Sequence, residues 1–154
     1  MSPLRVALGS DHAGFELKGE IAAFLAQEGH QVIDLGCHGP ESVDYPVYAE
    51  TVGDVVRLGR ADRGILLCGS GVGMAVAANK LPGIRAGLCH DSYLAHQGVE
   101  HDDMNVLVMG GLVVGRAQAL DLVRIFLAAR YTGEERHQRR LDQIRDLERR
   151  FAPQ

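Results

Sequence analysis

The chain of 154 residues lacks any apolar run near the roughly 20 residues that a helix needs to span a bilayer. Its first residues, MSPLRVALGSDHAGFEL, lack the basic segment, apolar segment and small-residue cleavage site of a signal peptide. The three cysteines, Cys37, Cys68 and Cys89, are odd in number, widely spaced and outside CxxC pairs. This pattern argues against a disulfide framework and against a zinc site. We therefore expect a cytoplasmic protein with three free thiols and no contact with membranes.

An excess of positive charge is also missing. The chain has 16 Lys and Arg against 20 Asp and Glu, which gives a formal net charge of −4, so a uniformly basic surface for nucleic acid is not expected. Hydrophobic residues make up 46% of the chain, which suffices for one buried core, and the length is too short for two ordinary domains. We expect a single domain over residues 1–154 that does not bind nucleic acid.

Short apolar runs alternate with longer segments of helical spacing. The apolar runs predict strands over residues 4–8, 31–35, 64–68, 84–89 and 106–109. The segments between them predict helices over residues 14–28, 46–58, 73–80, 92–100 and 116–130. The strands are too continuously apolar for a sheet with one face exposed to solvent. The pattern predicts an α/β fold, a three-layer α/β/α sandwich around a five-stranded parallel, Rossmann-like sheet. Glycines at strand ends place the active site at the carboxyl edge of that sheet.

The C-terminal stretch EERHQRRLDQIRDLERRF predicts one further amphipathic helix over residues 134–151. Leu141, Ile144, Leu147 and Phe151 recur at helical spacing, and charged residues fill most other positions. With the five strands already covered, this single apolar stripe is free to pack on its own domain or on a second subunit. We favour a dimer contact.

Cys68 ends the third predicted strand, and GSGVGM follows it directly. A glycine loop that opens a helix offers backbone N–H groups to an anion. The same positive end favours a thiolate, which makes Cys68 a candidate base or nucleophile. The alternative is a structural cysteine, because free cysteines are commonly just buried. The glycine loop favours the functional interpretation.

Two nucleotide-binding motifs are absent from this loop. It lacks the final glycine of GxGxxG, and no clear acidic strand end follows it, so dinucleotide binding is poorly supported. No GK[ST] follows, which excludes a Walker A loop. A small anion, such as a phosphate or an enediolate, fits the loop better, and we expect no cofactor.

Polar residues follow the first predicted strand and precede the fifth. In GSDHAG, Asp11 is either merely a helix N-cap or a functional residue, and His12 either binds phosphate or is an ordinary exposed histidine. In EHDDMN, several polar residues precede the fifth strand, and we expect them at the same edge as Cys68: His101, Asp102, Asp103 and Asn105. Adjacent residues cannot all point at one ion, so we expect no metal site.

Arg136 and Arg140 lie four residues apart in the last predicted helix. This spacing puts both guanidinium groups on one face, where they can converge on one phosphate. The alternative for such a basic run is a solvated helix face.

Taken together, GSDHAGFELK, DYP at residues 44–46, LLCGSGVGMAVAANKLPGIRA, EHDDMNVLVMGG and ERHQRR resemble the type B ribose-5-phosphate isomerases and the related galactose-6-phosphate isomerase subunits. The motifs occur in order, with compatible spacing, from about Arg5 to Arg149. The resemblance implies an enzyme that interconverts an aldose phosphate and a ketose phosphate through a cis-enediolate, without a metal or nucleotide.

The resemblance also implies roles for the residues around Cys68. Cys68 would move a proton between C2 and C1 of the sugar, and Ser70 would assist it. His101 would open the furanose ring, and Asp11 would handle hydroxyl protons. The anion hole for the enediolate would be formed by the backbone amides of Gly69, Gly71, Val72 and Gly73.

Further positions match contacts to the substrate. Tyr45 would line the sugar pocket, and His12, Arg136 and Arg140 would bind the phosphate. The family builds its site from two subunits, which implies a homodimer or a dimer of dimers with shared active sites. The C-terminal helix over 134–151 would then pack at the dimer interface.

Two positions depart from the ribose-5-phosphate enzymes. Asp102, a predicted substrate contact, stands where they commonly carry asparagine, and Leu112 stands where they commonly carry a phosphate-binding arginine. Each lost charge-assisted contact is worth about 1.5 to 3 kcal/mol. The sequence therefore leaves open an isomerase of a different or non-phosphorylated aldose, a non-catalytic sugar-phosphate binding protein, and an enzyme that uses Cys68 covalently.

Overall fold

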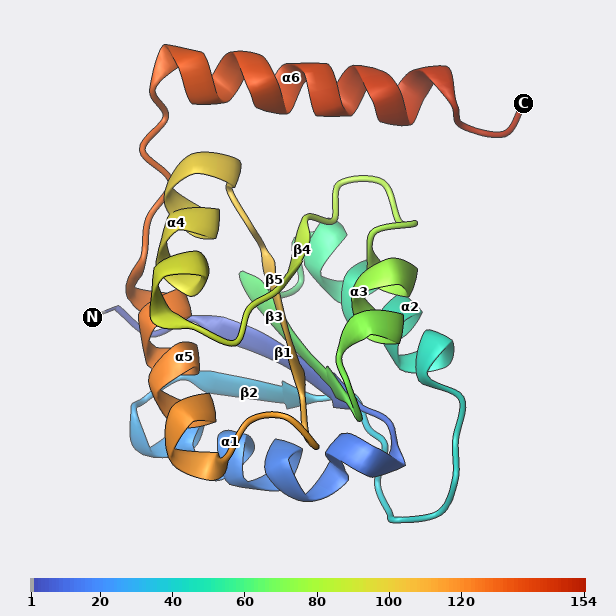
Figure 1. Ribbon diagram of the computed structural model, residues 1–154, viewed down its shortest axis with the longest axis vertical. Coiled ribbons are helices and arrows are strands. Elements are labelled where there is room, and N and C mark those ends of the chain that lie inside the picture. The colour runs from blue at the N-terminus through green and yellow to red at the C-terminus, as the bar shows by residue number, and fades with distance from the viewer. Residues whose placement is uncertain (1) are drawn as a thin grey trace.

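The computed structural model describes residues 2–154, which form a five-stranded parallel sheet with helices on both faces (Figure 1). The strands are β1 (Arg5–Ser10), β2 (Gln31–Asp34), β3 (Arg63–Cys68), β4 (Ala86–Leu88) and β5 (Val106–Gly110). The helices are η1 (His12–Gly14), α1 (Phe15–Gln27), α2 (Tyr45–Arg57), α3 (Val72–Ala78), α4 (Ser92–Asp102), α5 (Arg116–Ala128) and α6 (Glu135–Arg150). The strand order is β2-β1-β3-β5-β4, and every neighbouring pair is parallel. The predicted three-layer α/β/α sandwich is confirmed.

Side chains of successive strand residues point to opposite faces of the sheet and enter two separate cores. Leu8, Leu67 and Met109 pack against α1, α4 and α5. Leu66, Cys68 and Val108 pack against α2 and α3. Figure 1 shows these two groups of helices on either side of the sheet. Because β3 is central and buried on both faces, the backbone that carries Cys68 is held rigidly.

An ion pair between a buried lysine and an exposed aspartate holds the backbone beside the end of β1. Lys18, which is 2% exposed, donates to both carboxylate oxygens of Asp34 at 2.7 and 2.8 Å. Asp34 also accepts a hydrogen bond from the Gly36 N–H at 3.0 Å, and the Gly36 carbonyl accepts one from the Ser10 N–H at 2.8 Å. Removal of the Asp34 carboxylate would leave the buried Lys18 ammonium group unpaired. This chain of contacts fixes the segment just before Asp11.

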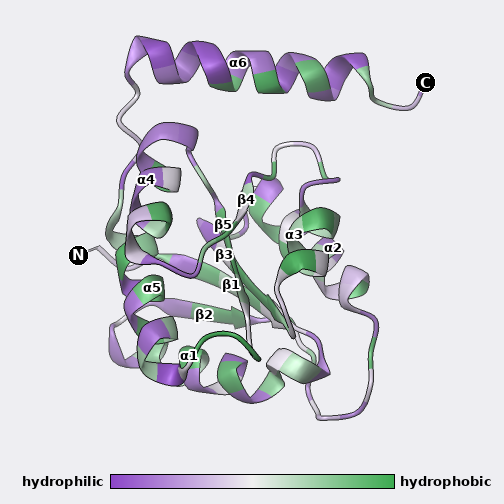
Figure 2. Cartoon of the chain, in the orientation of Figure 1, coloured by the Kyte–Doolittle hydropathy of each residue, from purple (hydrophilic) through white to green (hydrophobic). Residues whose placement is uncertain are grey.

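Helix α6 lies across one end of the molecule, apart from the helices that cover the sheet (Figure 1). Figure 2 shows it as mostly hydrophilic, with small hydrophobic patches. Of its predicted apolar stripe, only Leu141 is buried, at 3% exposure. The rest remains exposed: Ile144, Leu147 and Phe151 at 42, 47 and 80%. Helix α6 therefore covers little of its own domain, and its predicted role at a dimer interface stays a prediction.

Candidate active site at the carboxyl edge of the sheet

Cys68 is the last residue of β3 and is 5% exposed. Its Sγ accepts a hydrogen bond from the Gly71 N–H at 3.1 Å. Its carbonyl oxygen accepts one from the Gly111 N–H at 2.7 Å, in the turn that follows β5. Two segments that are distant in the sequence therefore meet at Cys68, as expected for the carboxyl ends of neighbouring parallel strands.

The loop from Gly69 to Gly73 is shaped by glycines in positions that side chains cannot occupy. Gly71 has φ +84°, and a β-carbon there would lie 2.5 Å from Leu88 Cδ1. The Val72 N–H donates to Ser70 Oγ at 3.2 Å, which ties the Ser70 hydroxyl to the start of α3. The loop thus passes close to the sheet edge, with Cys68 and its backbone amides side by side.

Asp11 acts as a helix cap. Its Oδ1 accepts hydrogen bonds from the Ala13 N–H at 2.9 Å and the Gly14 N–H at 3.2 Å. The N-cap interpretation of Asp11 is therefore correct. Both hydrogen bonds end on Oδ1, so the cap does not use the second carboxylate oxygen, Oδ2. The Asp11 N–H donates to the Leu67 carbonyl at 3.1 Å, so Asp11 lies beside the end of β3 and next to Cys68 in space.

His12 is exposed and precedes α1. Its Nδ1 accepts a hydrogen bond from the Val43 N–H at 3.2 Å, across the loop that leads to α2. With Nδ1 as the acceptor, the neutral ring carries its proton on Nε2. His12 therefore presents a donor at the same edge of the sheet as Cys68, as a phosphate contact requires.

Tyr45 opens α2 and reaches the glycine loop from the other side. A β-carbon at Gly73 would lie 2.6 Å from Cζ of the Tyr45 ring. This proximity confirms that the predicted sugar-pocket tyrosine lies beside the Cys68 loop. A side chain at position 73 would therefore require the Tyr45 ring to move, although the φ of Gly73 is not in the left-handed region.

Leu112 lies beside the loop as well. Its N–H donates to the Gly69 carbonyl at 3.0 Å, and its side chain is 82% exposed. The position that departs from the ribose-5-phosphate enzymes therefore adjoins the predicted anion hole.

His90 is a residue of this edge that sequence reasoning missed. The Gly110 N–H donates to His90 Nε2 at 3.0 Å, so His90 supports the turn that carries Leu112. Its position could have identified it, because His90 directly follows the carboxyl end of the predicted strand 84–89.

The segment EHDDMN does not lie at this edge, so that prediction was wrong. Helix α4 begins after the carboxyl end of β4 and runs back to the amino end of β5. His101 and Asp102 in its last turn therefore lie at the opposite edge from Cys68. Asn105 and Asp103 bind Arg85 there: Asn105 Oδ1 accepts from the Arg85 N–H at 2.8 Å, and Asp103 Oδ2 accepts from Arg85 Nη2 at 3.1 Å. A parallel strand that follows a helix must start at the amino edge.

His101 instead lies next to the start of α6. Its ring stacks on the ring of His137, with centroids 4.1 Å apart and planes 22° apart. Arg136 and Arg140 are exposed near this pair, and Arg136 forms a 3.1 Å ion pair with Glu134. The predicted site residues thus form two groups within one chain, one around Cys68 and the other around His101.

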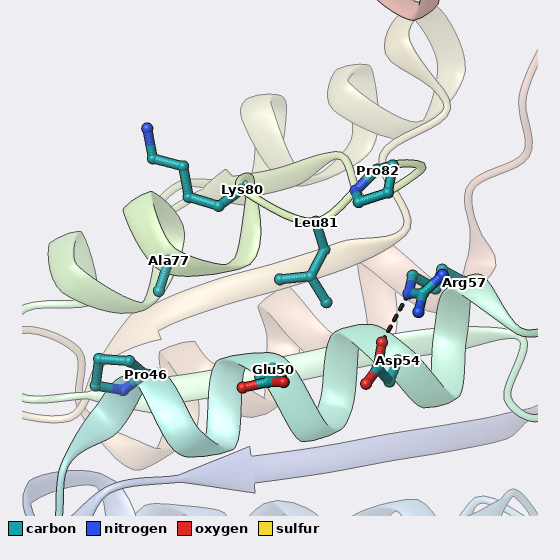
Figure 3. A pocket seen from close by; sticks show the side chains of 8 residues that line it. All are labelled: Pro46, Glu50, Asp54, Arg57, Ala77, Lys80, Leu81 and Pro82. Atoms are coloured by element: carbon teal, nitrogen blue, oxygen red, sulfur yellow. Dashed lines mark hydrogen bonds and ion pairs between the residues drawn. The ribbon is translucent and has the colours of Figure 1, made fainter. Parts of the chain in front are cut away.

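Two grooves lie outside the Cys68 group. One, of about 520 Å³ between α2 and α3, is lined by Glu50, Asp54, Lys80 and Leu81 among others. Figure 3 shows the ion pair of Asp54 with Arg57 on its α2 wall, with N–O distance 2.7 Å. Another, of about 390 Å³ beneath α6, includes Asp102. None of the predicted catalytic residues lines either groove.

Within residues 2–154, no group of three or more His, Cys, Asp or Glu side chains is placed to hold a metal ion. Over the same range, no helix combines the length and apolar character needed to cross a membrane. The expectation that the reaction needs no metal and no cofactor stays a prediction.

Comparison with known proteins identifies the family of the chain. The model of the Ribose/Galactose Isomerase family matches residues 6–144. The chain belongs to the ribose/galactose isomerase family. Ribose-5-phosphate isomerase B of Escherichia coli is 47% identical over 146 residues, covering 95% of this chain and 97% of that protein. Ribose-5-phosphate isomerase B of Mycolicibacterium paratuberculosis is 41% identical over 152 residues, covering 95% and 92%.

Solved structures of the family share the fold over the full length. Ribose-5-phosphate isomerase B of Clostridium thermocellum has a TM-score of 0.94 at 47% identity, covering 96% of this chain and 99% of that one. The type B ribose 5-phosphate isomerase of Trypanosoma brucei has a TM-score of 0.91 at 42% identity, covering 95% and 99%. The family resemblance seen in the motifs is therefore confirmed along the whole chain.

Proposed function

We propose that this chain is an aldose-ketose isomerase that interconverts ribose 5-phosphate and ribulose 5-phosphate, with Cys68 as the base. The observation that carries the proposal is the position of Cys68 Sγ, 3.1 Å from the Gly71 amide at the carboxyl end of the central strand. It occurs in a chain that matches ribose-5-phosphate isomerases over nearly its full length.

In the proposed reaction, the Cys68 thiolate removes the proton from C2 of the open-chain aldose. The electron pair moves to the carbonyl oxygen at C1 and forms the enediolate, and the Cys68 proton then returns to C1. A proton moves from the C2 hydroxyl to O1, and Asp11 handles this transfer through Oδ2, because Oδ1 caps η1. The amides of the Gly69 to Gly73 loop stabilise the negative charge, which develops only as the reaction proceeds.

We also propose that the complete site is shared between two copies of the chain. Within one chain, His101, Arg136 and Arg140 lie at the other edge of the sheet from Cys68, so they cannot act on the same sugar. A second copy in a homodimer, or in a dimer of dimers, would supply them. Exposed apolar side chains support such an interface: Val72, Val76, Tyr93, Leu94, Ile144, Leu147 and Phe151.

The three cysteines are free and buried. This state is typical of a reducing compartment. It supports a cytoplasmic location, where the enzyme would act on its phosphorylated sugar.

The proposed function is tested by proton NMR of the enzyme with ribose 5-phosphate in deuterated water. Formation of ribulose 5-phosphate, with deuterium entering only at C1, is the expected result. Cys68→Ala should lower the rate by about a hundredfold or more, because general bases contribute about 10² to 10⁴, while titration calorimetry still detects sugar binding. Cys89→Ala, a matched cysteine change away from the site, should keep the activity. Retained turnover in Cys68→Ala would exclude Cys68 as the base.

The shared site has its own test. Cys68→Ala and His101→Ala are each expected to be inactive. If they are unfolded together and refolded, random pairing gives heterodimers with one intact site, and about a quarter of the wild-type activity should return. A site contained within one chain would give no recovery.

A further inference from the structure

His137 is a buried polar residue in an exposed part of the molecule. Its side chain is 3% exposed, although its neighbours in the first turn of α6 are exposed. Its Nε2 is buried without a hydrogen-bond partner in residues 2–154, and the Glu134 carboxylate is 3.9 Å away. A buried nitrogen without a partner costs stability, and a hydrophobic residue would fill this position at lower cost. The imidazole therefore needs another explanation.

The stack with His101 supplies one. The two rings lie 4.1 Å apart and nearly parallel, so His137 covers one face of the His101 ring. The His101 Nδ1 also lies 3.1 Å from the Gln97 side-chain amide nitrogen. The stack sets the plane of the His101 ring, and the Gln97 contact sets its rotation within that plane. Both constraints leave His101 Nε2 as the atom free to meet a substrate.

The surroundings of His137 favour its neutral form. Burial lowers the pKa of His137 below its ordinary value, and the nearby His101, Arg136 and Arg140 lower it further, while Glu134 opposes the change. Two imidazolium rings in contact would repel each other. A neutral His137 therefore supports the His101 ring without competing for a proton.

We propose that His137 is a positioning residue that holds the His101 ring in the orientation needed to open the furanose form of the substrate. This inference rests on the proposed isomerase function and on the role of His101 in ring opening. His137 itself does not touch the sugar; it acts through the stack. Its loss should therefore impair the step that needs His101 and spare the proton transfer at Cys68.

The chemistry of the two sugars separates these steps. Ribose 5-phosphate is largely cyclic and must open before C2 can lose its proton. Ribulose 5-phosphate has its carbonyl at C2 and a phosphate on O5, so it has no free hydroxyl that could close a five-membered ring. Exchange of its C1 proton with solvent needs enediolate formation at Cys68 but no ring opening.

The test compares His137→Ala with His137→Phe, which keeps an aromatic ring in the stack but has no titratable nitrogen. For His137→Ala, we expect kcat on ribose 5-phosphate to fall about tenfold through misorientation of His101, with KM little changed. Deuterium exchange at C1 of ribulose 5-phosphate should stay near the wild-type rate. His137→Phe should restore most of the turnover on ribose 5-phosphate.

Gln138→Ala is the matched control, because Gln138 is adjacent on α6 and its side chain bonds to Tyr131 and Asp142, at 3.1 and 3.0 Å. It should behave as wild type. Wild-type turnover in His137→Ala, equal loss of turnover and exchange, or a His137→Phe variant as slow as His137→Ala would each overturn the proposal.

A measurement without substrate separates this inference from the proposed function. The ring current of a stacked neighbour shifts the Hε1 resonance of His101. This shift should be lost in His137→Ala and kept in His137→Phe. If the wild-type enzyme does not isomerise ribose 5-phosphate, the proposed function fails. If the His101 resonance is the same in all three proteins, the positioning role fails.

Discussion

Gly73 and Tyr45 lie so close together that a β-carbon at position 73 would be 2.6 Å from Cζ of the tyrosine ring. Tyr45 begins α2 and Gly73 lies in the first turn of α3, so the contact joins two helices at the proposed sugar pocket. With the Tyr45 ring in this position, the glycine is favoured by its neighbour and not by its own backbone angles.

Gly73→Ala should therefore displace the Tyr45 ring and raise KM for ribose 5-phosphate about three- to tenfold through misplacement of a binding group. Steady-state kinetics measures the change. Tyr45→Ala provides the control: once the ring is absent, adding Gly73→Ala should have little further effect, because the two changes share one contact. Additive losses would show that the alanine acts on something other than Tyr45.

Leu112→Arg should lower KM for ribose 5-phosphate about tenfold, since a charge-assisted contact to the phosphate is worth about 1.5 to 3 kcal/mol. The exposed Leu112 backbone bonds to Gly69, so an arginine at this position lies beside the anion-binding loop. Val113→Arg adds the same charge at the next exposed position and should have a smaller effect. Equal effects of both changes would indicate general electrostatic attraction and count against a specific contact.

Cys89 should resist alkylation in the folded protein. Burial, helped by the Asp91 carboxylate, raises the pKa of Cys89 to about 11. At pH 8, roughly one thiol in a thousand is then in the reactive thiolate form. Peptide mass mapping after iodoacetamide treatment should find Cys89 unmodified in the native protein and modified in urea. Rapid labelling of Cys89 without urea would contradict this assignment.

The lowered pKa of His137 predicts a loss of stability in acid. Its ordinary value is 6.5, so as pH falls through that value the unfolded chain binds a proton that the folded chain does not yet bind. The free energy of unfolding therefore decreases with falling pH, and the decrease stops below the folded-state pKa. His101, Arg136, Arg140 and Glu134 are the charged or titratable groups that face the ring.

Urea unfolding at pH 7.5 and pH 5 tests this linkage. His137→Phe keeps the stacked ring but cannot titrate, so its stability relative to wild type should increase at pH 5. Titratable groups that do not contact His137 are common to both proteins and cancel in the comparison. A relative stability that does not change with pH would show that His137 titrates alike in the folded and unfolded states.

The predicted elements agree with the structure where the chain has strong local signals. The apolar run that ends at Cys68 is β3, and the glycines after it form the turn into α3. The length of the edge strand β4 was overestimated. The sequence predicted a strand over 84–89, and the observed strand spans Ala86–Leu88, because β4 pairs only with β5. The C-terminal helix was placed within a residue of its observed ends, Glu135 and Arg150.

Prediction of the site was more uneven. Asp11, His12 and the Cys68 loop gather at one edge, as expected from strand ends, and Tyr45, which only the family resemblance indicated, lies beside them. His101 and Asp102 lie at the other edge, because α4 returns the chain to the start of β5. His90 and His137 were not identified, since their roles depend on contacts with Gly110 and His101, which are distant in the sequence.

The amino-acid sequence by itself determined the alternation of strands and helices, the loop geometry after Cys68 and the family, because apolar periodicity and glycine positions act over short distances along the chain. The tertiary structure alone decided the strand order β2-β1-β3-β5-β4, the division of the site residues between two edges and the burial of His137 against His101. These features depend on which strands pair and where each helix must return the chain, and no local pattern encodes that pairing.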